Sequence, residues 1–304
     1  MKRVAVVVGL AWLIVGLVGA FSYAHNYYVY RGFTPPHDPP HVQVGKAVVV
    51  SFRSRALRAR RSYVVYLPAG YAAAAARGAR FPVLYLLHGT PGGPRQFLDI
   101  ARVGVLQDML LARGQAHPFL IVMPDGRDGS YASDTEWADT RHGRYESFVL
   151  DVVHDVDTRW STLPDRAHRG IAGNSEGAYG AMNVGLRHLG TFGVIEAWSG
   201  YYVQTRSGPF RHAPPALLRA NGPARYVASL APRLRRDRVQ AFVYTGDGDE
   251  YRAQSLAFAH ALAEAGGWVS FADFHGRHDW RLWRQHAPAM LRFADRWLSP
   301  GAVV

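Results

Sequence analysis

Ser175 stands between two glycines in the stretch GIAGNSEGAYGAM, which begins at Gly170. The run GIAG before it has the apolar character of a short strand, and the small residues after it are typical of a helix. A G-x-S-x-G sequence between a strand and a helix favours a strained turn that lifts the serine hydroxyl above the sheet, and Gly173 and Gly177 leave room for that turn. We therefore predict that Ser175 is a nucleophile rather than only a small residue at a tight turn.

A serine nucleophile needs a general base and an acid that orients the base. His278 lies just past the last predicted strand and is the better candidate for the base. His275 lies nearer the strand, and we expect it to make a structural hydrogen bond. The preceding strand ends in TGDGDEY, which offers three carboxylates. Asp249 is favoured as the acid, with Asp247 and Glu250 as the alternatives.

The same chemistry needs two hydrogen-bond donors for the oxyanion that forms when a serine attacks a carbonyl group. One donor is expected to be the backbone amide of Glu176, the residue after the nucleophile. The glycine-rich turn in VLYLLHGTPGG supplies the second, with the amide of Thr90 as the first choice and that of Gly89 next. His88 is expected to brace this loop by hydrogen bonding. The lysine of a phosphate-binding P-loop is missing there, which argues against nucleotide binding.

A sheet has to position these residues, and from Lys46 onward the chain alternates short apolar runs with helical patterns. The first two runs predict an antiparallel pair, and most later runs are continuously apolar, as in a parallel sheet covered on both faces. The predicted strands are 47–52, 63–67, 83–87, 119–123, 170–173, 194–199, 240–246 and 268–274. Helices are expected between them, for example over 146–160 and 251–265. The pattern predicts an α/β domain with a mostly parallel sheet of about eight strands flanked by helices, and a site at the carboxyl ends of the strands.

The N-terminal part of the chain predicts a membrane segment. Two basic residues precede an uncharged and mostly apolar run over 4–21, which is about long enough to cross a bilayer. The charge bias puts the N-terminus in the cytoplasm and the rest of the chain outside, as an anchored protein or, if a signal peptidase cleaves it, a secreted one. We expect a signal-anchor or transmembrane helix over 1–24, a proline-rich linker over 25–45 and the catalytic domain over 46–300.

The composition limits which classes of partner and cofactor the protein can bind. The chain of 304 residues has no cysteine, which excludes disulfides, thiol catalysis and thiolate metal sites. Its formal net charge of +12 comes almost entirely from scattered arginines, without the basic stripe interleaved with aromatic residues that marks nucleic-acid binding. We expect no nucleic-acid partner, no cofactor and no metal.

The motifs together resemble the esterase family of α/β-hydrolases that includes esterase D (S-formylglutathione hydrolase), feruloyl esterases, enterobactin-type esterases and the secreted mycolyltransferases. The resemblance spans about residues 46–298 and rests on YVVYLPAGY, FPVLYLLHGTPGG, VMPDG, GIAGNSEGAYGAMNVGLRH, SGYY, TGDGDEY and GRHDWRLW. It implies the α/β-hydrolase fold with Ser175, Asp249 and His278 as a catalytic triad. It also implies an oxyanion hole formed by the backbone amides of Glu176 and the Thr90 loop.

The chain departs from the resemblance directly after the nucleophile. Many members have methionine where this chain has Glu176, and a second glycine where it has Ala178. The backbone amide of residue 176 is still available to an oxyanion, so the substitution need not lower the rate of catalysis. We expect the Glu176 carboxylate at the mouth of the site to repel anionic substrates.

The expected function is hydrolysis of a carboxylic ester through an acyl-serine intermediate, outside the cytoplasm, on a small-molecule or cell-envelope ester. One alternative is an acyltransferase of the mycolyltransferase type that moves the acyl group to a sugar or cell-envelope acceptor. Another is a surface binding protein that kept the fold and lost turnover. The segment from Tyr201 to Arg238 is the expected specificity element, with Arg206, Arg211 and Arg219 either contacting an acidic or sugar-bearing ligand or simply solvated.

Overall fold

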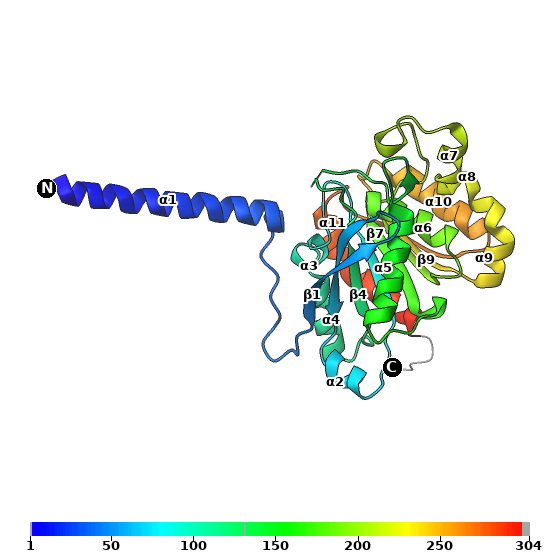
Figure 1. Cartoon of the computed structure of the whole chain (residues 1–304), viewed down its shortest axis with the longest axis horizontal. Helices are drawn as coiled ribbons and strands as arrows, with labels where there is room; N and C mark the ends of the chain where they lie inside the picture. The colour runs from blue at the N-terminus through cyan, green and yellow to red at the C-terminus, as the bar shows by residue number, and fades with distance from the viewer. Residues whose placement is uncertain (1, 131, 300–304) are drawn as a thin grey trace.

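The computed structural model describes residues 2–130 and 132–299. It consists of a long N-terminal helix, α1 (Lys2–Tyr30), an irregular linker and an α/β domain. Helix α1 projects away from the domain, and the linker runs from its end to the first strand (Figure 1). The predicted site residues lie in the α/β domain, so the candidate site has to be sought there and at the point where the linker meets the domain.

The domain is built on an eight-stranded sheet with the order β1-β2-β4-β3-β7-β8-β9-β10. Strand β2 pairs antiparallel with both β1 and β4, and the remaining neighbours are parallel. The strands are β1 (Lys46–Ser54), β2 (Ala59–Leu67), β3 (Val83–Leu87), β4 (Leu120–Pro124), β7 (Arg169–Asn174), β8 (Val194–Trp198), β9 (Gln240–Gly246) and β10 (Trp268–Phe274). This confirms the eight predicted strands, and the largest shift is at β2, which begins at Ala59 rather than at residue 63.

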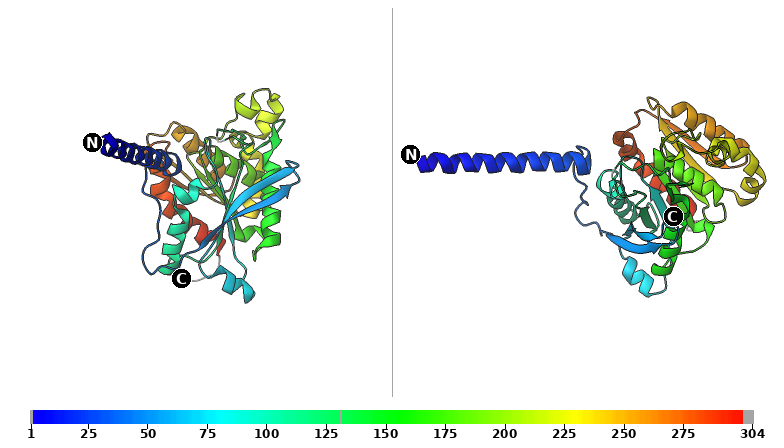
Figure 2. Two further views of the ribbon diagram at one scale, coloured as in Figure 1. Left: turned by 60° about the vertical axis from the view of Figure 1, so that its left-hand side comes forward. Right: turned by 45° about the horizontal axis from the view of Figure 1, so that its top comes forward.

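Helices cover both faces of the sheet, which explains why the parallel strands are almost continuously apolar (Figure 2). Helices α5 (Tyr145–Arg159), α6 (Glu176–Arg187) and α10 (Arg252–Glu264) pack into the core on one face. Helices α3 (Gln96–Asp99), α4 (Val103–Ala112) and α11 (Trp280–Leu298) pack into the core on the other. Strands β3, β7 and β8 lie between these two layers, so residues at their carboxyl ends have a rigid base.

Several short elements occupy the connections. The helical ones are α2 (Tyr71–Ala76), α7 (Pro215–Ala220), α8 (Pro223–Tyr226), α9 (Ala231–Asp237) and the 3₁₀ turns η1 (Arg166–His168), η2 (Gly208–Phe210) and η3 (Val227–Leu230). Two-residue strands β5 (Asp139–Thr140) and β6 (Gly143–Arg144) form a separate small hairpin before α5. Most of the segment from Tyr201 to Arg238 is thus a string of short helices beside the sheet rather than part of it.

The expected helices form because their apolar residues recur on one side. In α5 the buried positions are Phe148, Val149, Val152, Val153 and Val156, and burial of each such side chain contributes about 1.5–3 kcal/mol. Helix α10 ends before Gly266, whose φ of +104° suits a residue without a Cβ.

Helix α1 is longer than the apolar run alone predicts. It continues past residue 24 to Tyr30, so the first part of the expected linker is helical. The stretch Gly9–Tyr30 is apolar and long enough to cross a membrane and is not buried against the domain, although a signal sequence has the same properties. Beyond it the linker meets the domain again, since the Gly45 amide donates a hydrogen bond to Asp108 Oδ2 on α4 at 3.1 Å.

Candidate active site

Ser175 occupies the turn between β7 and α6 in a conformation that few residues adopt. Its φ is 56° and its ψ is −121°, and its amide donates to the carbonyl of Trp198 at the end of β8, at 2.9 Å. A Cβ added at Gly177 would lie 1.9 Å from the carbonyl oxygen of Leu87, and one at Gly173 would lie 2.3 Å from the carbonyl oxygen of Gly177. The two glycines are therefore required by close backbone approach, which is the reason that the G-x-S-x-G spacing predicts this turn.

His278 and Asp249 complete a hydrogen-bonded chain that starts at Ser175. The Nε2 atom of His278 lies 2.8 Å from Ser175 Oγ, and its Nδ1 atom lies 3.2 Å and 3.1 Å from the two carboxylate oxygens of Asp249. A proton on Nδ1 can donate to Asp249 and leaves Nε2 to accept from the serine hydroxyl. Burial opposes the ionisation of Asp249, but hydrogen bonds from His278 and Ser199 hold the pKa of this carboxyl below its usual value. The chain can thus transfer a proton from Ser175 to His278.

Neither of the other candidate acids, Asp247 and Glu250, is hydrogen-bonded to His278 within the described residues. Asp247 accepts from the Gly276 amide at 3.0 Å and lies 3.0 Å from Nδ1 of His275, whose side chain is 99% exposed. His275 therefore makes the structural contact that the sequence predicts. Glu250 is exposed. Asp249 is the member of TGDGDEY that the fold brings to His278.

Aromatic rings hold the His278 imidazole on two sides. The rings of Tyr251 and Trp283 each pack edge-on against it with centroid distances of 5.1 Å. Trp283 is itself fixed, because its Nε1 donates to Ser199 Oγ at 3.0 Å. These contacts keep the ring in line with Ser175, although His278 lies on a loop.

His88 braces the loop after β3, as predicted. It is buried, and burial lowers the pKa of its imidazole to about 4, so the ring is neutral. Its Nδ1 lies 3.0 Å from the Gly89 carbonyl, and its Nε2 accepts from the Gly126 amide at 3.1 Å. The His88 carbonyl accepts from Trp137 Nε1 at 3.0 Å. The loop that presents Gly89 and Thr90 is thus held from both sides.

The side chain of Glu176 is not at the mouth of the site, and this expectation was wrong. It is buried, with 4% of its surface exposed, because the first turn of α6 directs it towards the loop before α5. Its Oε1 accepts from the amides of Thr135 at 3.2 Å and Glu136 at 2.7 Å, and its Oε2 is hydrogen-bonded to Thr90 Oγ1. Thr90 Oγ1 also donates to the Ser133 carbonyl at 2.9 Å. Glu176 therefore connects the turn at Ser175, between β7 and α6, to the loop that contains Thr90.

A second buried carboxyl lies beside the first. Glu136 Oε2 accepts from Tyr201 Oη at 2.6 Å and from Gln204 Nε2 at 3.0 Å. Burial, with the charge of Asp134, raises the pKa of Glu136 to about 7. Burial and the charge of Glu136 together raise the pKa of Glu176 well above its usual value. Sequence reasoning missed this pair of buried carboxyls, although the unusual glutamate directly after Ser175 was a signal that could have pointed to it.

The backbone amide of Glu176 is the first of α6, and Thr90 follows Gly89, at which an added Cβ would lie 3.0 Å from Ser175 Cβ. Within the described parts of the chain neither the Glu176 nor the Thr90 N–H donates a hydrogen bond to another protein group. A free N–H at the start of α6 is typical of helix N-termini, where it favours negative charge.

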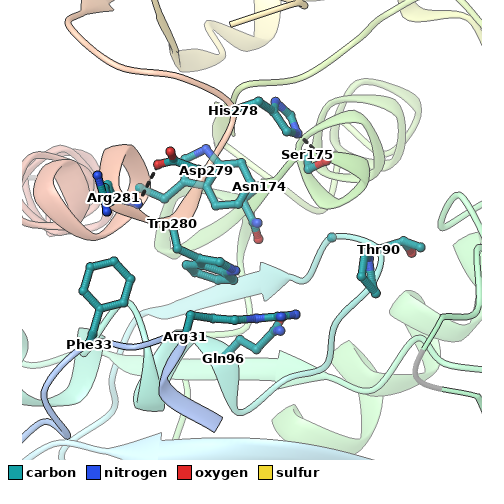
Figure 3. Close-up of a pocket in the computed structure, with 13 residues that line it drawn as sticks. Arg31, Phe33, Thr90, Gln96, Asn174, Ser175, His278, Asp279, Trp280 and Arg281 are labelled. Carbon is teal, nitrogen blue, oxygen red and sulfur yellow. Dashed lines mark hydrogen bonds between the residues drawn. The ribbon is translucent and has the colours of Figure 1, made fainter. Parts of the chain in front are cut away.

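A cavity of about 400 Å³ opens beside Ser175. Its lining includes Arg31, Phe33, Thr90, Gln96, Asn174, Ser175, His278, Asp279, Trp280, Arg281 and Trp283 (Figure 3). The segment from Tyr201 to Arg238 contributes no residue to this lining, and Arg206, Arg211 and Arg219 are exposed. The pocket walls instead come from the Thr90 loop, the start of α11 and the residues after α1. We call this cavity the Ser175 pocket.

Across residues 2–130 and 132–299, no three His, Asp or Glu side chains form a group that could hold a metal ion.

Solved structures share this architecture. A ferulic acid esterase superposes with a TM-score of 0.75 and 28% identity, over 84% of this chain and 99% of that one. A fluorophosphonate-binding serine hydrolase of Staphylococcus aureus, FphF, has a TM-score of 0.69 and 17% identity over 83% of this chain and 99% of its own, so its likeness concerns the fold. The domain has the α/β-hydrolase fold.

Curated relatives match over shorter stretches. An endo-1,4-beta-xylanase/feruloyl esterase of Xylanibacter ruminicola is 27% identical over 157 residues, which are 51% of this chain and 22% of the relative. An esterase of Mycobacterium tuberculosis is 30% identical over 124 residues, 40% of this chain and 26% of the relative. The match thus spans about a quarter of these longer proteins. A family model described as "Putative esterase" matches residues 54–294, nearly the whole α/β domain, and the chain belongs to this esterase family.

Proposed function

We propose that this protein is a carboxylic ester hydrolase that works through an acyl enzyme on Ser175. The observation that carries the proposal is the hydrogen-bonded chain from Ser175 through His278 to the buried Asp249, with 2.8 Å between Ser175 Oγ and His278 Nε2. The chain lies at the carboxyl ends of parallel strands and opens into a pocket large enough for a small ester.

In the first half-reaction His278 accepts the proton of Ser175 as the hydroxyl oxygen attacks the ester carbonyl. Asp249 orients the imidazole and stabilises the imidazolium that forms. His278 then gives the proton to the departing alcohol, which leaves an acyl group on Ser175 Oγ. In the second half-reaction water attacks the acyl group, with His278 as the base, and releases the carboxylic acid.

The negative charge of each tetrahedral intermediate needs preorganised donors. We assign this role to the backbone amides of Glu176 and Thr90, whose N–H groups are free of other partners in the described chain. Loss of one such donor typically costs about 3 kcal/mol of transition-state stabilisation. The hydrogen bond between the Glu176 side chain and Thr90 supports the assignment, because it fixes the two donors relative to each other.

The location proposed for the reaction is outside the cytoplasm. Helix α1 then anchors the chain, or is removed as a signal sequence, and the basic residues at its start, Lys2 and Arg3, remain on the cytoplasmic side. Residues 31–45 connect this helix to the proposed catalytic domain, for which the bounds 46–300 are kept.

The test is hydrolysis of p-nitrophenyl esters from acetate to long acyl chains, and of methyl ferulate, by the full-length protein in detergent. We expect turnover that falls at least about 10⁴-fold in Ser175→Ala, since the serine supplies the bond-forming atom. A fluorophosphonate probe should label the wild type on Ser175 and leave the variant unlabelled.

Two results would count against the proposal. One is ester turnover that survives in folded Ser175→Ala protein, and the other is folded wild-type protein that neither hydrolyses any ester nor reacts with the probe. Ser130→Ala is the matched control, because Ser130 is exposed and lies outside the pocket lining. It should retain full activity.

A further inference from the structure

Two residues of the Ser175 pocket come from the segment directly after α1. Helix α1 ends at Tyr30, and Arg31 and Gly32 then turn the chain with φ values of 54° and 78°. The Phe33 amide donates to the Tyr30 carbonyl at 2.9 Å within this turn. The turn brings Arg31 and Phe33 against the pocket, where Arg31 extends across the cavity near Trp280 (Figure 3).

Contacts with α11 hold this segment in place. The Arg284 guanidinium lies 4.9 Å from the centre of the Phe33 ring, and its Nη2 donates to the Thr34 carbonyl at 3.4 Å. Arg284 Nη1 also donates to the carbonyl of Ile100 at 2.5 Å, so its side chain is fixed. The segment is therefore a docked wall of the pocket rather than a loose part of the linker.

The wall combines positive charge with aromatic surface. Arg31 and Arg281 bring guanidinium groups to the pocket lining, and Phe33 and Trp280 bring rings. Among the lining residues within the described chain, Asp279 is the one carboxylate, and its Oδ1 already accepts from the backbone amides of Arg281 and Leu282 at the start of α11. The buried Glu176 does not face the cavity. The surroundings thus favour a substrate with an apolar part and a negative charge.

The position of the segment relative to α1 points to where such a substrate comes from. The candidate span Gly9–Tyr30 has 22 residues, which in a helix measure about 33 Å and match the roughly 30 Å of a bilayer core. The tyrosines at its end, Tyr27 and Tyr28, are exposed, as in the aromatic belt at a membrane surface. With Gly9–Tyr30 across a bilayer, Arg31 lies at the level of the lipid headgroups.

We propose that Arg31 and Phe33 form a substrate-binding wall that selects an amphiphilic carboxylic ester carrying a negative charge, taken from the membrane surface. This inference rests on the proposed esterase function of the same site. Arg31 pairs with the anionic group of the substrate, and Phe33 contacts its apolar part. Water cleaves the acyl–oxygen bond, releasing a fatty acid and an alcohol that keeps the anionic group.

The test compares two lipids that carry the same ester and differ in charge. Full-length protein is reconstituted in phosphatidylcholine vesicles that contain either 1-oleoylglycerol or 1-oleoylglycerol 3-phosphate, and release of oleate is measured. We expect the wild type to prefer the phosphate-bearing ester. Arg31→Gln should lower kcat/KM for that ester about ten-fold or more, the value of a charge-assisted contact, and change it less than about two-fold for 1-oleoylglycerol.

Further variants separate the effect of the Arg31 charge from the effects of side-chain shape and of folding. Arg31→Lys keeps the charge and should retain most of the preference, while Phe33→Ala should lower activity on both lipids. Arg55→Gln, at an exposed position in the turn between β1 and β2, is the matched control and should change neither. Hydrolysis of p-nitrophenyl butyrate in the same samples reports on the catalytic centre independently.

The outcomes distinguish this inference from the proposed function. The inference is overturned if Arg31→Gln affects both lipids equally, if it affects neither, or if wild-type protein cleaves p-nitrophenyl butyrate but neither lipid. If Ser175→Ala protein cleaves p-nitrophenyl butyrate as fast as the wild type, the proposed function itself fails.

Discussion

Replacement of the Glu176 side chain tests how the nucleophile turn and the Thr90 loop are joined. Thr90 Oγ1 lies within hydrogen-bond distance of two acceptors, the Ser133 carbonyl and Glu176 Oε2, yet a hydroxyl has one proton. A protonated Glu176 solves this, because it donates to Thr90 while Thr90 donates to Ser133. Burial and the charge of Glu136, which raise the pKa of Glu176, favour that protonated form.

Glu176→Gln should therefore be almost silent, and Glu176→Ala should not. The glutamine amide donates to Thr90, and its carbonyl oxygen accepts from the amides of Thr135 and Glu136. We expect a free energy of unfolding within about 1 kcal/mol of wild type and kcat within a few-fold. The alanine variant leaves those two buried amides without their acceptor at about 1–3 kcal/mol each, so we expect a loss of roughly 2–6 kcal/mol.

The alanine variant should also lower kcat roughly 10²-fold, because the Thr90 donor is no longer fixed. Urea unfolding followed by circular dichroism gives the stability, and p-nitrophenyl acetate hydrolysis gives kcat. Glu250→Ala, at an exposed carboxylate, is the control and should match wild type. The reasoning is refuted if Glu176→Gln loses as much as Glu176→Ala, or if Glu176→Ala keeps wild-type kcat.

Three further predictions concern the acid, the pH dependence of stability and the turn. Asp249→Asn should lower kcat about 10⁴-fold, while Asp247→Asn changes it only a few-fold; equal effects in steady-state assays would refute the assignment. Burial raises the pKa of Glu136 from 4.5 to about 7, so its contribution to the free energy of unfolding is complete below pH 4.5 and is lost as the pH rises through 7, about 3 kcal/mol in total. Urea unfolding of wild type and Glu136→Gln across this range should show a weaker dependence in the variant, where Glu176 is the remaining buried carboxyl with a raised pKa. Gly177→Ala should cost about 3 kcal/mol or more, measured as a lower unfolding midpoint, because its Cβ meets the Leu87 carbonyl; wild-type stability would contradict the close approach.

The sheet and the Ser175–His278–Asp249 chain could be predicted because their signals are local. Continuous apolar runs mark parallel strands, and the residues at their carboxyl ends must share one edge of the sheet. TGDGDEY left three acids open, and the choice among them depends on the turn that buries Asp249 and leaves Asp247 beside His275.

Other parts of the site depend on contacts between distant segments, which sequence patterns do not carry. The carboxyl of Glu176 was expected at the mouth of the site but is buried against residues 135 and 136. The specificity element was expected in 201–238, yet the Ser175 pocket is lined by Arg31 and Phe33 and by no residue of that segment, and Phe33 packs on Arg284 far along the chain. Such docking depends on the length and path of the linker rather than on any local pattern.

The close packing of Gly177 against the end of β3 has a consequence for thermal motion. The Leu87 carbonyl that touches Gly177 lies three residues before Thr90, so the turn at Ser175 and the loop proposed to supply an oxyanion donor are joined by this backbone contact and should move together. His278 arrives on a separate loop after β10 and is aligned by Asp249, Tyr251 and Trp283. On heating, the Ser175–His278 distance should therefore widen before the Ser175–Thr90 distance does. Activity should be lost because Ser175 can no longer transfer its proton to His278, while the turn at Ser175 still has its native geometry.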